Sequence, residues 1–147
     1  MTPSFEAGKR LLVVEDEEAL LSTLRDELEE NGFTVEPALT GEEALRKVRE
    51  KSPDGVIIDL LLHGEVDGLG VLAQLKQSDG TRNLPVVILS NIGDDEKVRE
   101  ALDRGADAYL VKTRYSLEDL VERLRVLLQG KSAPAVQSSL DSPSSSR

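Results

Sequence analysis

Five short apolar runs are spaced along the chain, and each is apolar enough to form a buried strand. These runs are Leu11–Val14, Thr34–Ala38, Val56–Ile58, Val86–Leu89 and Ala108–Val111. The stretches between them are longer, and their apolar residues recur at a helical spacing. The chain therefore alternates between strand-like and helix-like segments from one end of this region to the other.

The intervening segments also contain signals for where helices begin and end. Leu20, Leu24 and Leu28 repeat at i, i+4 and i+8, which is one stripe of an amphipathic helix, and Asn31-Gly32 is a typical helix end. A later helix is expected to contain Leu69, Val71, Leu72 and Leu75. Three N-terminal caps are predicted, from Thr40 with Glu43, from Asp94, and from Ser116 with Asp119.

Strands that alternate with helices predict a mostly parallel sheet with helices on both faces. Crossover connections between parallel strands are right-handed, which favours a doubly wound sheet. A common strand order of such sheets is 2-1-3-4-5. We therefore expect an α/β fold with a five-stranded parallel sheet in the flavodoxin-like order.

The composition changes near residue 130 and suggests one folded domain with two flanking segments. The last 17 residues, 131–147, read KSAPAVQSSLDSPSSSR and contain few bulky apolar side chains. Such a segment cannot bury enough surface to offset its ordering entropy, so a disordered Ser/Pro-rich tail is expected. We predict an N-terminal extension over 1–8 and a single domain over 9–130.

Net charge and composition exclude several classes of protein. The formal charge of −10 and the 3% aromatic content argue against direct nucleic-acid binding, which requires a basic surface and stacking side chains. Cys is absent, so disulfides and thiolate metal sites are excluded. No apolar run is long enough to cross a membrane, and the N-terminus does not resemble a secretory signal. A cytoplasmic protein is expected.

Polar residues follow four of the predicted strands, at the edge where doubly wound sheets bind ligands. Glu15 and Asp16 follow the first strand, Asp59 the third, Ser90 the fourth and Lys112 the fifth. Two carboxylates about 4 Å apart repel by roughly 4 kcal/mol at an effective dielectric of 20. One ammonium cannot neutralise three carboxylates. The sequence therefore predicts a divalent cation at this edge, and an all-oxygen ligand set favours Mg²⁺.

These groups together suggest phosphoryl transfer to a carboxylate. A carboxylate can attack phosphorus and form an aspartyl phosphate. Cations and hydrogen-bond donors then stabilise the oxygens of the transferring group. Asp59 is the expected acceptor, because it is central in the predicted order, with Lys112 and the hydroxyl of Ser90 as contacts of the phosphoryl oxygens.

The segments LLVVEDEEAL, GVIIDLLLHGEVDGLGVL, LPVVILSN and ADAYLVK, in this order, resemble a response-regulator receiver domain over residues 9 to 130. The resemblance implies that Asp59 accepts a phosphoryl group from a histidine kinase or a histidine phosphotransfer protein. It also implies that Asp16 binds Mg²⁺ directly and Glu15 through water, and that the backbone carbonyl of Leu61 is a further ligand. Tyr109 matches the aromatic residue that switches on activation.

Three features depart from the family pattern. Glu15 stands where an Asp is common, which has little consequence for metal binding. The segment after Asp59 is one residue longer than usual, and His63 replaces a usual Pro, so the geometry of this loop should differ. We expect His63 itself to be an exposed loop residue. Thr113 replaces the Pro that usually follows Lys112 in a cis bond, so a strained bond or another approach of Lys112 is expected.

The leading hypothesis is a stand-alone, chemotaxis-type receiver that switches a surface for an unidentified downstream protein, without enzymatic turnover beyond its own phosphorylation and dephosphorylation. Two alternatives remain open. One is a degenerate receiver that binds partners independently of phosphorylation. The other is an aspartyl-phosphate phosphatase, which is disfavoured because Leu61 stands where such enzymes place a second Asp. Leu61 and Ile92 are apolar at the positions that tune hydrolysis in the family, so slow autodephosphorylation is expected.

Overall fold

The computed structural model describes residues 8–129, which form five parallel strands and five helices in strict alternation. Residues 1–7 of the predicted extension and the whole predicted tail, 131–147, lie outside the described residues. The strands are β1 (Arg10–Val14), β2 (Thr34–Ala38), β3 (Gly55–Ile58), β4 (Val86–Ser90) and β5 (Ala108–Val111). The helices are α1 (Glu18–Glu30), α2 (Gly41–Glu50), α3 (Gly68–Gln77), α4 (Asp95–Asp103) and α5 (Leu117–Gln129).

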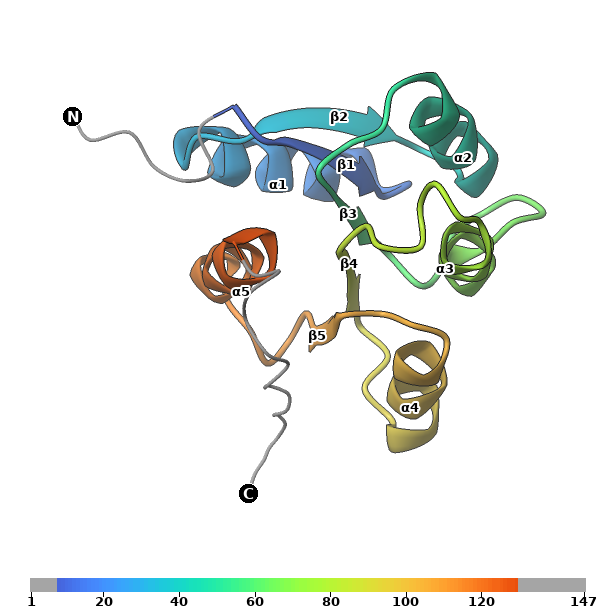
Figure 1. Ribbon diagram of the computed structural model, residues 1–147. Coiled ribbons are helices and arrows are strands. Elements are labelled where there is room, and N and C mark those ends of the chain that lie inside the picture. Colours follow the sequence, from blue (N-terminus) through green and yellow to red (C-terminus); the bar gives the residue numbers. More distant parts are fainter. Residues whose placement is uncertain (1–7, 130–147) are drawn as a thin grey trace.

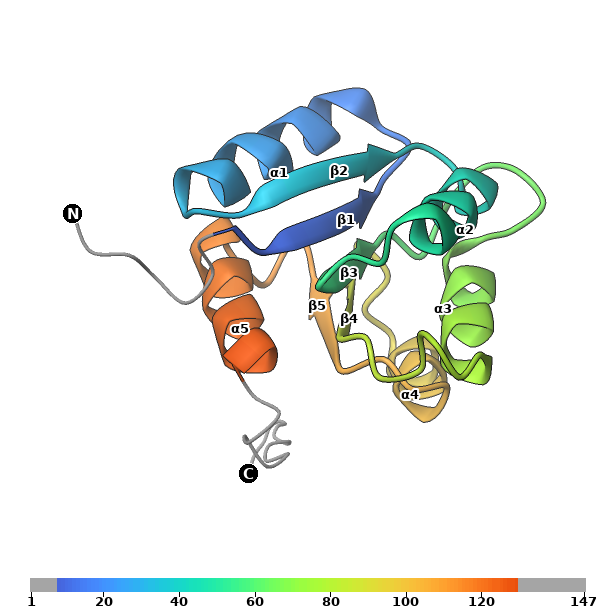
Figure 2. The same cartoon turned by 45° about the horizontal axis from the view of Figure 1, so that its top comes forward.

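The sheet has the order β2-β1-β3-β4-β5, and all of its neighbouring strands are parallel, as predicted. Figures 1 and 2 show α1 and α5 on one face of the sheet and α2, α3 and α4 on the other. Side chains along β1 alternate between two cores: Leu11 and Val13 pack with α1 and α5, whereas Leu12 and Val14 pack with the other three helices. The sheet is therefore buried on both faces, which explains why its strands are continuously apolar.

Local capping interactions mark where α2, α4 and α5 begin, as the sequence predicts. The amide of Glu43 donates to the hydroxyl of Thr40 over 3.0 Å, and Asp94 accepts from the amide of Lys97 over 2.8 Å. Ser116 and Asp119 form a reciprocal pair, with each backbone amide donating to the other side chain. These bonds satisfy amides that have no partner inside their own helix.

The predicted stripe of α1 differs from the observed one by one position. Leu24 and Leu28 are buried as expected, but Leu21 completes the buried stripe, and Leu20 is only partly buried. Both patterns fit a helical period, and the orientation of α1 over the sheet and α5 decides between them. The helix ends at Glu30 with Asn31 as its C-cap, and Gly32 follows with a φ of 99°, as predicted for a left-handed position.

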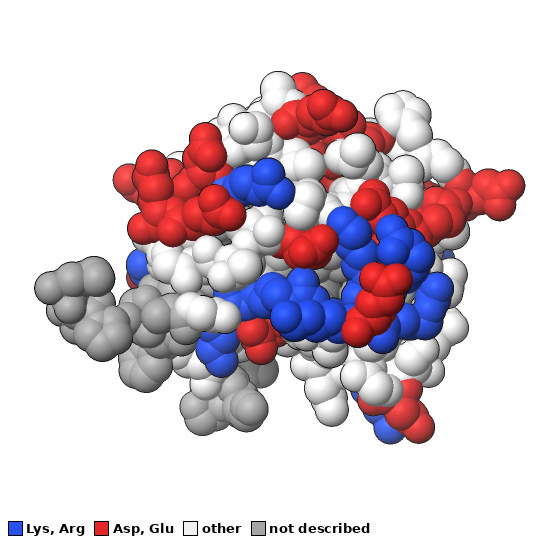
Figure 3. Space-filling model, turned by 90° about the horizontal axis from the view of Figure 1, so that it is seen from above, with Lys and Arg blue, Asp and Glu red and all other residues white. Residues whose placement is uncertain are grey.

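The face that contains β2 and α2 has mixed charge. Figure 3 shows a band of Lys and Arg side chains there, interrupted and flanked by Asp and Glu. Lys47 of α2 pairs with Glu36 of β2 over 2.9 Å and with Glu43 of α2 over 3.1 Å. On this face there is no uninterrupted basic surface of the kind that nucleic-acid binding requires.

Candidate functional site: an acidic cluster at the carboxyl edge of the sheet

Four neighbouring strands bring the predicted site residues to one edge of the sheet. Glu15 and Asp16 directly follow β1, and Asp59 directly follows β3. Ser90 is the last residue of β4, and Lys112 is the first residue after β5. Because the strands are parallel and adjacent in the order β1-β3-β4-β5, their carboxyl ends point to the same place.

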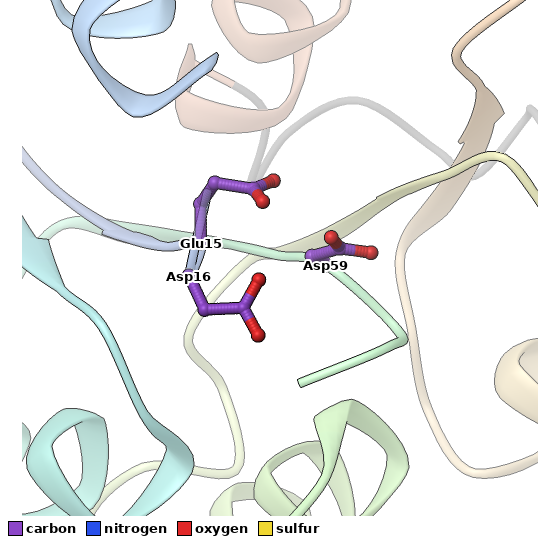
Figure 4. A group of neighbouring side chains, drawn as sticks. All are labelled: Glu15, Asp16 and Asp59. Atoms are coloured by element: carbon purple, nitrogen blue, oxygen red, sulfur yellow. The ribbon is translucent and has the colours of Figure 1, made fainter. Parts of the chain in front are cut away.

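Glu15, Asp16 and Asp59 form a compact acidic cluster. Each offers a carboxylate oxygen that lies within 4.8 Å of those of the other two. Figure 4 shows the three carboxylates gathered around one space, two from the turn after β1 and one from the end of β3. Glu15 and Asp59 are buried, with 2% and 8% of their surfaces exposed. Three oxygen ligands with this spacing suit a hard divalent cation.

Lys112 brings an ammonium group to this cluster. Its ammonium nitrogen lies 3.4 Å from Glu15 Oε1 and 3.4 Å from Asp59 Oδ2. The peptide bond between Lys112 and Thr113 is trans, as are all peptide bonds in the described part of the chain. The substitution of Pro by Thr113 therefore does not prevent Lys112 from reaching both carboxylates.

The carboxylate of Asp59 is held in one orientation by a donor on each oxygen. The backbone amide of Leu61 donates to Oδ1 over 3.2 Å, and Lys112 approaches Oδ2. The side chain of Leu61 points away from the core and is 61% exposed. The role predicted for the backbone carbonyl of Leu61 in metal binding stays a prediction.

Ser90 and Tyr109 are both tied to the loop between β4 and α4. Ser90 is fully buried, and its hydroxyl accepts a hydrogen bond of 3.2 Å from the amide of Ile92. The hydroxyl of Tyr109 donates to the backbone carbonyl of the same Ile92. Burial raises the pKa of Tyr109, so this phenol stays a donor at neutral pH. The switching role of Tyr109 remains a prediction.

His63 contacts the cluster, which the sequence analysis did not predict. Its side chain is 93% exposed, as expected for a loop residue. Its backbone amide nevertheless donates to Asp16 Oδ2 over 3.0 Å, and its Nδ1 contacts the same oxygen. The two residues are 47 positions apart in the sequence, so no local pattern could have indicated this contact.

The environment of Glu15 opposes its ionisation. Burial and the neighbouring charge of Asp59 raise the pKa of Glu15 to about 7. The amide of Glu17 and the ammonium of Lys112 act in the opposite direction but do not compensate. A bound cation would supply the positive charge that this buried carboxylate lacks.

This raised pKa predicts that the metal-free protein loses stability as the pH rises through a defined window. In the unfolded chain Glu15 ionises near 4.5, whereas in the folded protein it keeps its proton up to about pH 7. The folded state binds more protons between these values, so the contribution of Glu15 is fully present below 4.5 and is lost by about pH 7.

The comparison of wild type with Glu15→Gln in EDTA isolates this effect. We expect the stability of the wild type relative to the variant to fall by about 1–3 kcal/mol across the window, measured by urea unfolding at several pH values. A difference between the two proteins that does not change with pH would contradict the prediction.

Comparison with known proteins identifies the family that has this arrangement. Residues 11–125 match the response regulator receiver domain. The chain belongs to this family. A crystal structure of a response regulator from Chloroflexus aurantiacus superimposes on this receiver domain with a TM-score of 0.78 and 32% identity, covering 83% of this chain and 98% of the other. A CheY-like receiver domain protein from Methanospirillum hungatei has a TM-score of 0.77 and 26% identity, covering 86% of this chain and 98% of the other.

Curated relatives are longer than this chain. The phosphate regulon transcriptional regulatory protein PhoB of Rhizobium meliloti is 38% identical over 131 residues, which cover 89% of this chain and 56% of the relative. The response regulator MprA of Mycobacterium ulcerans is 38% identical over 120 residues, covering 82% of this chain and 50% of the relative. The chain thus spans about half the length of these relatives. None of its helices within 8–129 is long and apolar enough to cross a bilayer.

Proposed function

We propose that this receiver domain accepts a phosphoryl group on Asp59 from a histidine kinase or a histidine phosphotransfer protein, with Mg²⁺ as cofactor. The main support is the meeting of Asp59, two further carboxylates and Lys112 at one point of the sheet edge. A plain strand end would not need three carboxylates within 4.8 Å of one another, two of them paired with one ammonium. We further propose that the domain catalyses no reaction beyond its own phosphorylation and dephosphorylation.

The acidic cluster would hold the cation. Asp16 and Asp59 would bind it directly, Glu15 would act through water, and the carbonyl of Leu61 would complete the protein ligands. When bound, Mg²⁺ supplies positive charge that offsets the carboxylates and the phosphoryl oxygens. The residues present fit this role, because every side-chain donor in the cluster is a carboxylate oxygen.

Asp59 is positioned to act as the nucleophile. One of its oxygens attacks phosphorus, the new O–P bond forms, and the bond from phosphorus to the donor breaks with its electron pair leaving on the donor. The amide of Leu61 and the ammonium of Lys112 fix the carboxylate beforehand, which favours attack in one orientation. After transfer, Lys112 and the hydroxyl of Ser90 would contact phosphoryl oxygens.

The contacts of Ser90 and Tyr109 suggest how phosphorylation could change a binding surface. The hydroxyl of Ser90 is bonded to the amide of Ile92, and Tyr109 to its carbonyl. A phosphoryl oxygen that accepts a hydrogen bond from Ser90 would draw this hydroxyl toward it and so move the acceptor of the first bond. This movement would bias the β4–α4 loop, to which Tyr109 is tied. The shift would alter the affinity of a downstream protein for this side of the domain. The stand-alone character and the cytoplasmic location stay predictions.

Intact-mass spectrometry with a small-molecule phosphodonor tests the proposal. After incubation with acetyl phosphate and Mg²⁺, we expect the mass of one added phosphoryl group, and no addition when EDTA replaces Mg²⁺. Incubation with an autophosphorylated histidine kinase serves as a second donor. No added mass with either donor would favour the degenerate receiver, which binds partners without phosphorylation. Addition that is independent of Mg²⁺ would contradict the role of the acidic cluster.

The phosphorylated form is expected to be long-lived, because Leu61 and Ile92 are apolar and cannot position an attacking water. Leu61 is 61% exposed, so Leu61→Asn should cost little stability, whereas Ile92 packs against the core. We expect Leu61→Asn and Ile92→Asn each to shorten the half-life several-fold, because an amide side chain can orient an attacking water. The effect should stay below the roughly 10²-fold of a general base, since the amide does not take a proton from the water. The decay is followed by intact mass after removal of the donor. An unchanged decay rate in both variants would refute this explanation.

A further inference from the structure

We infer that His63 is a positioning residue for the metal ligand Asp16, which it holds through its backbone amide and its imidazole. This inference rests on the proposed function, in which Asp16 binds the cation. His63 lies in the loop between β3 and α3. Its backbone amide nitrogen and its imidazole Nδ1 both contact a single oxygen, Oδ2 of Asp16.

The contact is part of a loop that is fixed at both sides. Next to His63, Gly64 adopts a left-handed φ of 103°, where other residues are strained. The amide of Glu65 then donates to Glu42 Oε2 at the start of α2 over 3.2 Å. The β3–α3 loop therefore contacts both the turn after β1 and the N-terminus of α2, and these contacts fix the position of His63.

The chemistry of the contact requires the imidazole to be the donor. An ionised carboxylate only accepts hydrogen bonds, so Nδ1 must carry the proton in the contact with Asp16 Oδ2. Two donors on Oδ2 leave the other oxygen of Asp16 to bind a cation, and they fix the plane of the carboxylate. Hydrogen bonds to metal-ligating groups act in this way in many metal sites.

The position of His63 does not favour a role as a direct ligand of the same ion. Among the described residues, the group whose ligand atoms all lie within 4.8 Å of one another consists of Glu15, Asp16 and Asp59, without His63. The imidazole therefore lies on the outer side of Asp16. It acts on the cation through the carboxylate that it holds.

The experiment measures Mg²⁺ binding to the full chain by isothermal titration calorimetry, with MgCl₂ alone as the probe. We expect His63→Ala to weaken binding by about tenfold, at the low end of the 10–100-fold range for partners of metal ligands. His63→Asn is the matched control, because its side-chain amide can place a donor where Nδ1 lies, and it should restore most of the affinity. His63 is 93% exposed, so neither substitution should impair folding, which thermal unfolding in EDTA verifies.

A double-mutant cycle with Asp16→Ala separates positioning from other effects. If His63 acts through Asp16, His63→Ala has no further effect on Mg²⁺ affinity in the Asp16→Ala background, as followed by amide chemical shifts. Unchanged or tighter binding by His63→Ala alone, or an additional loss in that background, would overturn the inference. Absence of Mg²⁺ binding by the wild type would instead overturn the metal dependence of the proposed function.

Discussion

Asp59→Asn is expected to abolish the addition of a phosphoryl group from acetyl phosphate in the presence of Mg²⁺. The amide nitrogen and the uncharged oxygen of Asn cannot replace the carboxylate as a nucleophile. The substitution preserves the shape of the side chain and an acceptor for the amide of Leu61, which now donates to Asp59 Oδ1. We therefore expect complete loss of the modification in a protein that remains folded.

Stability provides a first control for this variant. Asp59 is 8% exposed, and its charge is one of the causes that raise the pKa of Glu15. Removing this charge relieves repulsion in the cluster, so the metal-free variant should be at least as stable as the wild type in urea unfolding. If the variant is folded but is not modified, the loss results from the missing nucleophile and not from unfolding.

Asp79→Asn is the matched substitution outside the site. Asp79 has an 88% exposed side chain, and it forms a surface ion pair with Arg82 over 3.1 Å. We expect this variant to gain one phosphoryl group at the wild-type rate. If Asp59→Asn still gained the same mass, with the modification mapped to another residue by fragmentation, the assignment of Asp59 as acceptor would be wrong.

Gly68→Ala should destabilise the fold by about 3 kcal/mol or more, the upper end of what overpacking costs. Gly68 is the first residue of α3, and a Cβ built there would lie 2.4 Å from the carbonyl oxygen of Asp59 and 2.6 Å from the Cα of Leu60. Both atoms belong to the backbone, so no side-chain rotation can relieve the contact. α3 would have to move away from the segment that carries the phosphoacceptor.

The appropriate control is Gly70→Ala in the same helix. There a Cβ would lie 3.1 Å from Cγ1 of Val66, a side chain that can shift, and Ala favours the helical conformation by about 1 kcal/mol over Gly. We expect Gly70→Ala to remain within about 1 kcal/mol of the wild type in urea unfolding followed by circular dichroism. Equal stability of the two variants would contradict the close approach of α3 to Asp59.

Gly68→Ala should also impair phosphorylation, which links packing to function. The amide of Gly68 donates to the carbonyl of Leu60 over 3.1 Å, so the start of α3 helps to fix the chain around Asp59. Displacement of this segment would alter the orientation of the Asp59 carboxylate. A slower addition of the phosphoryl group, measured under conditions where the variant is folded, is the expected result.

Much of the site could be predicted from the sequence, because the positions of strand ends depend on local patterns. Each apolar run ends where polar residues begin, and parallel neighbours place their carboxyl ends at one edge. Asp59 and Lys112 are 53 residues apart, yet this rule alone was enough to predict that they meet. The helix caps were predictable for a similar reason, since Thr40 and Glu43 interact within one helical turn.

Other features depended on how the elements pack together. The buried stripe of α1 includes Leu21 in place of Leu20, and Leu102 of α4 is 45% exposed although its spacing is compatible with burial. Several helix phases satisfy the same apolar period within one or two positions. The neighbours of each helix select one of them, and those neighbours are distant in the sequence.

The sequence by itself determined the fold class and the residues of the acidic edge, because these follow from local periodicity and from the geometry common to parallel sheets. The strand order was predicted as a common order of such sheets, and the structure confirmed it. Only the tertiary structure decided that His63 contacts Asp16, that Gly68 must lack a side chain, and that Lys112 reaches two carboxylates across a trans bond. Such contacts form or fail through differences of a few tenths of an ångström in the distance between segments that are far apart in the chain. No local pattern of residues encodes those distances.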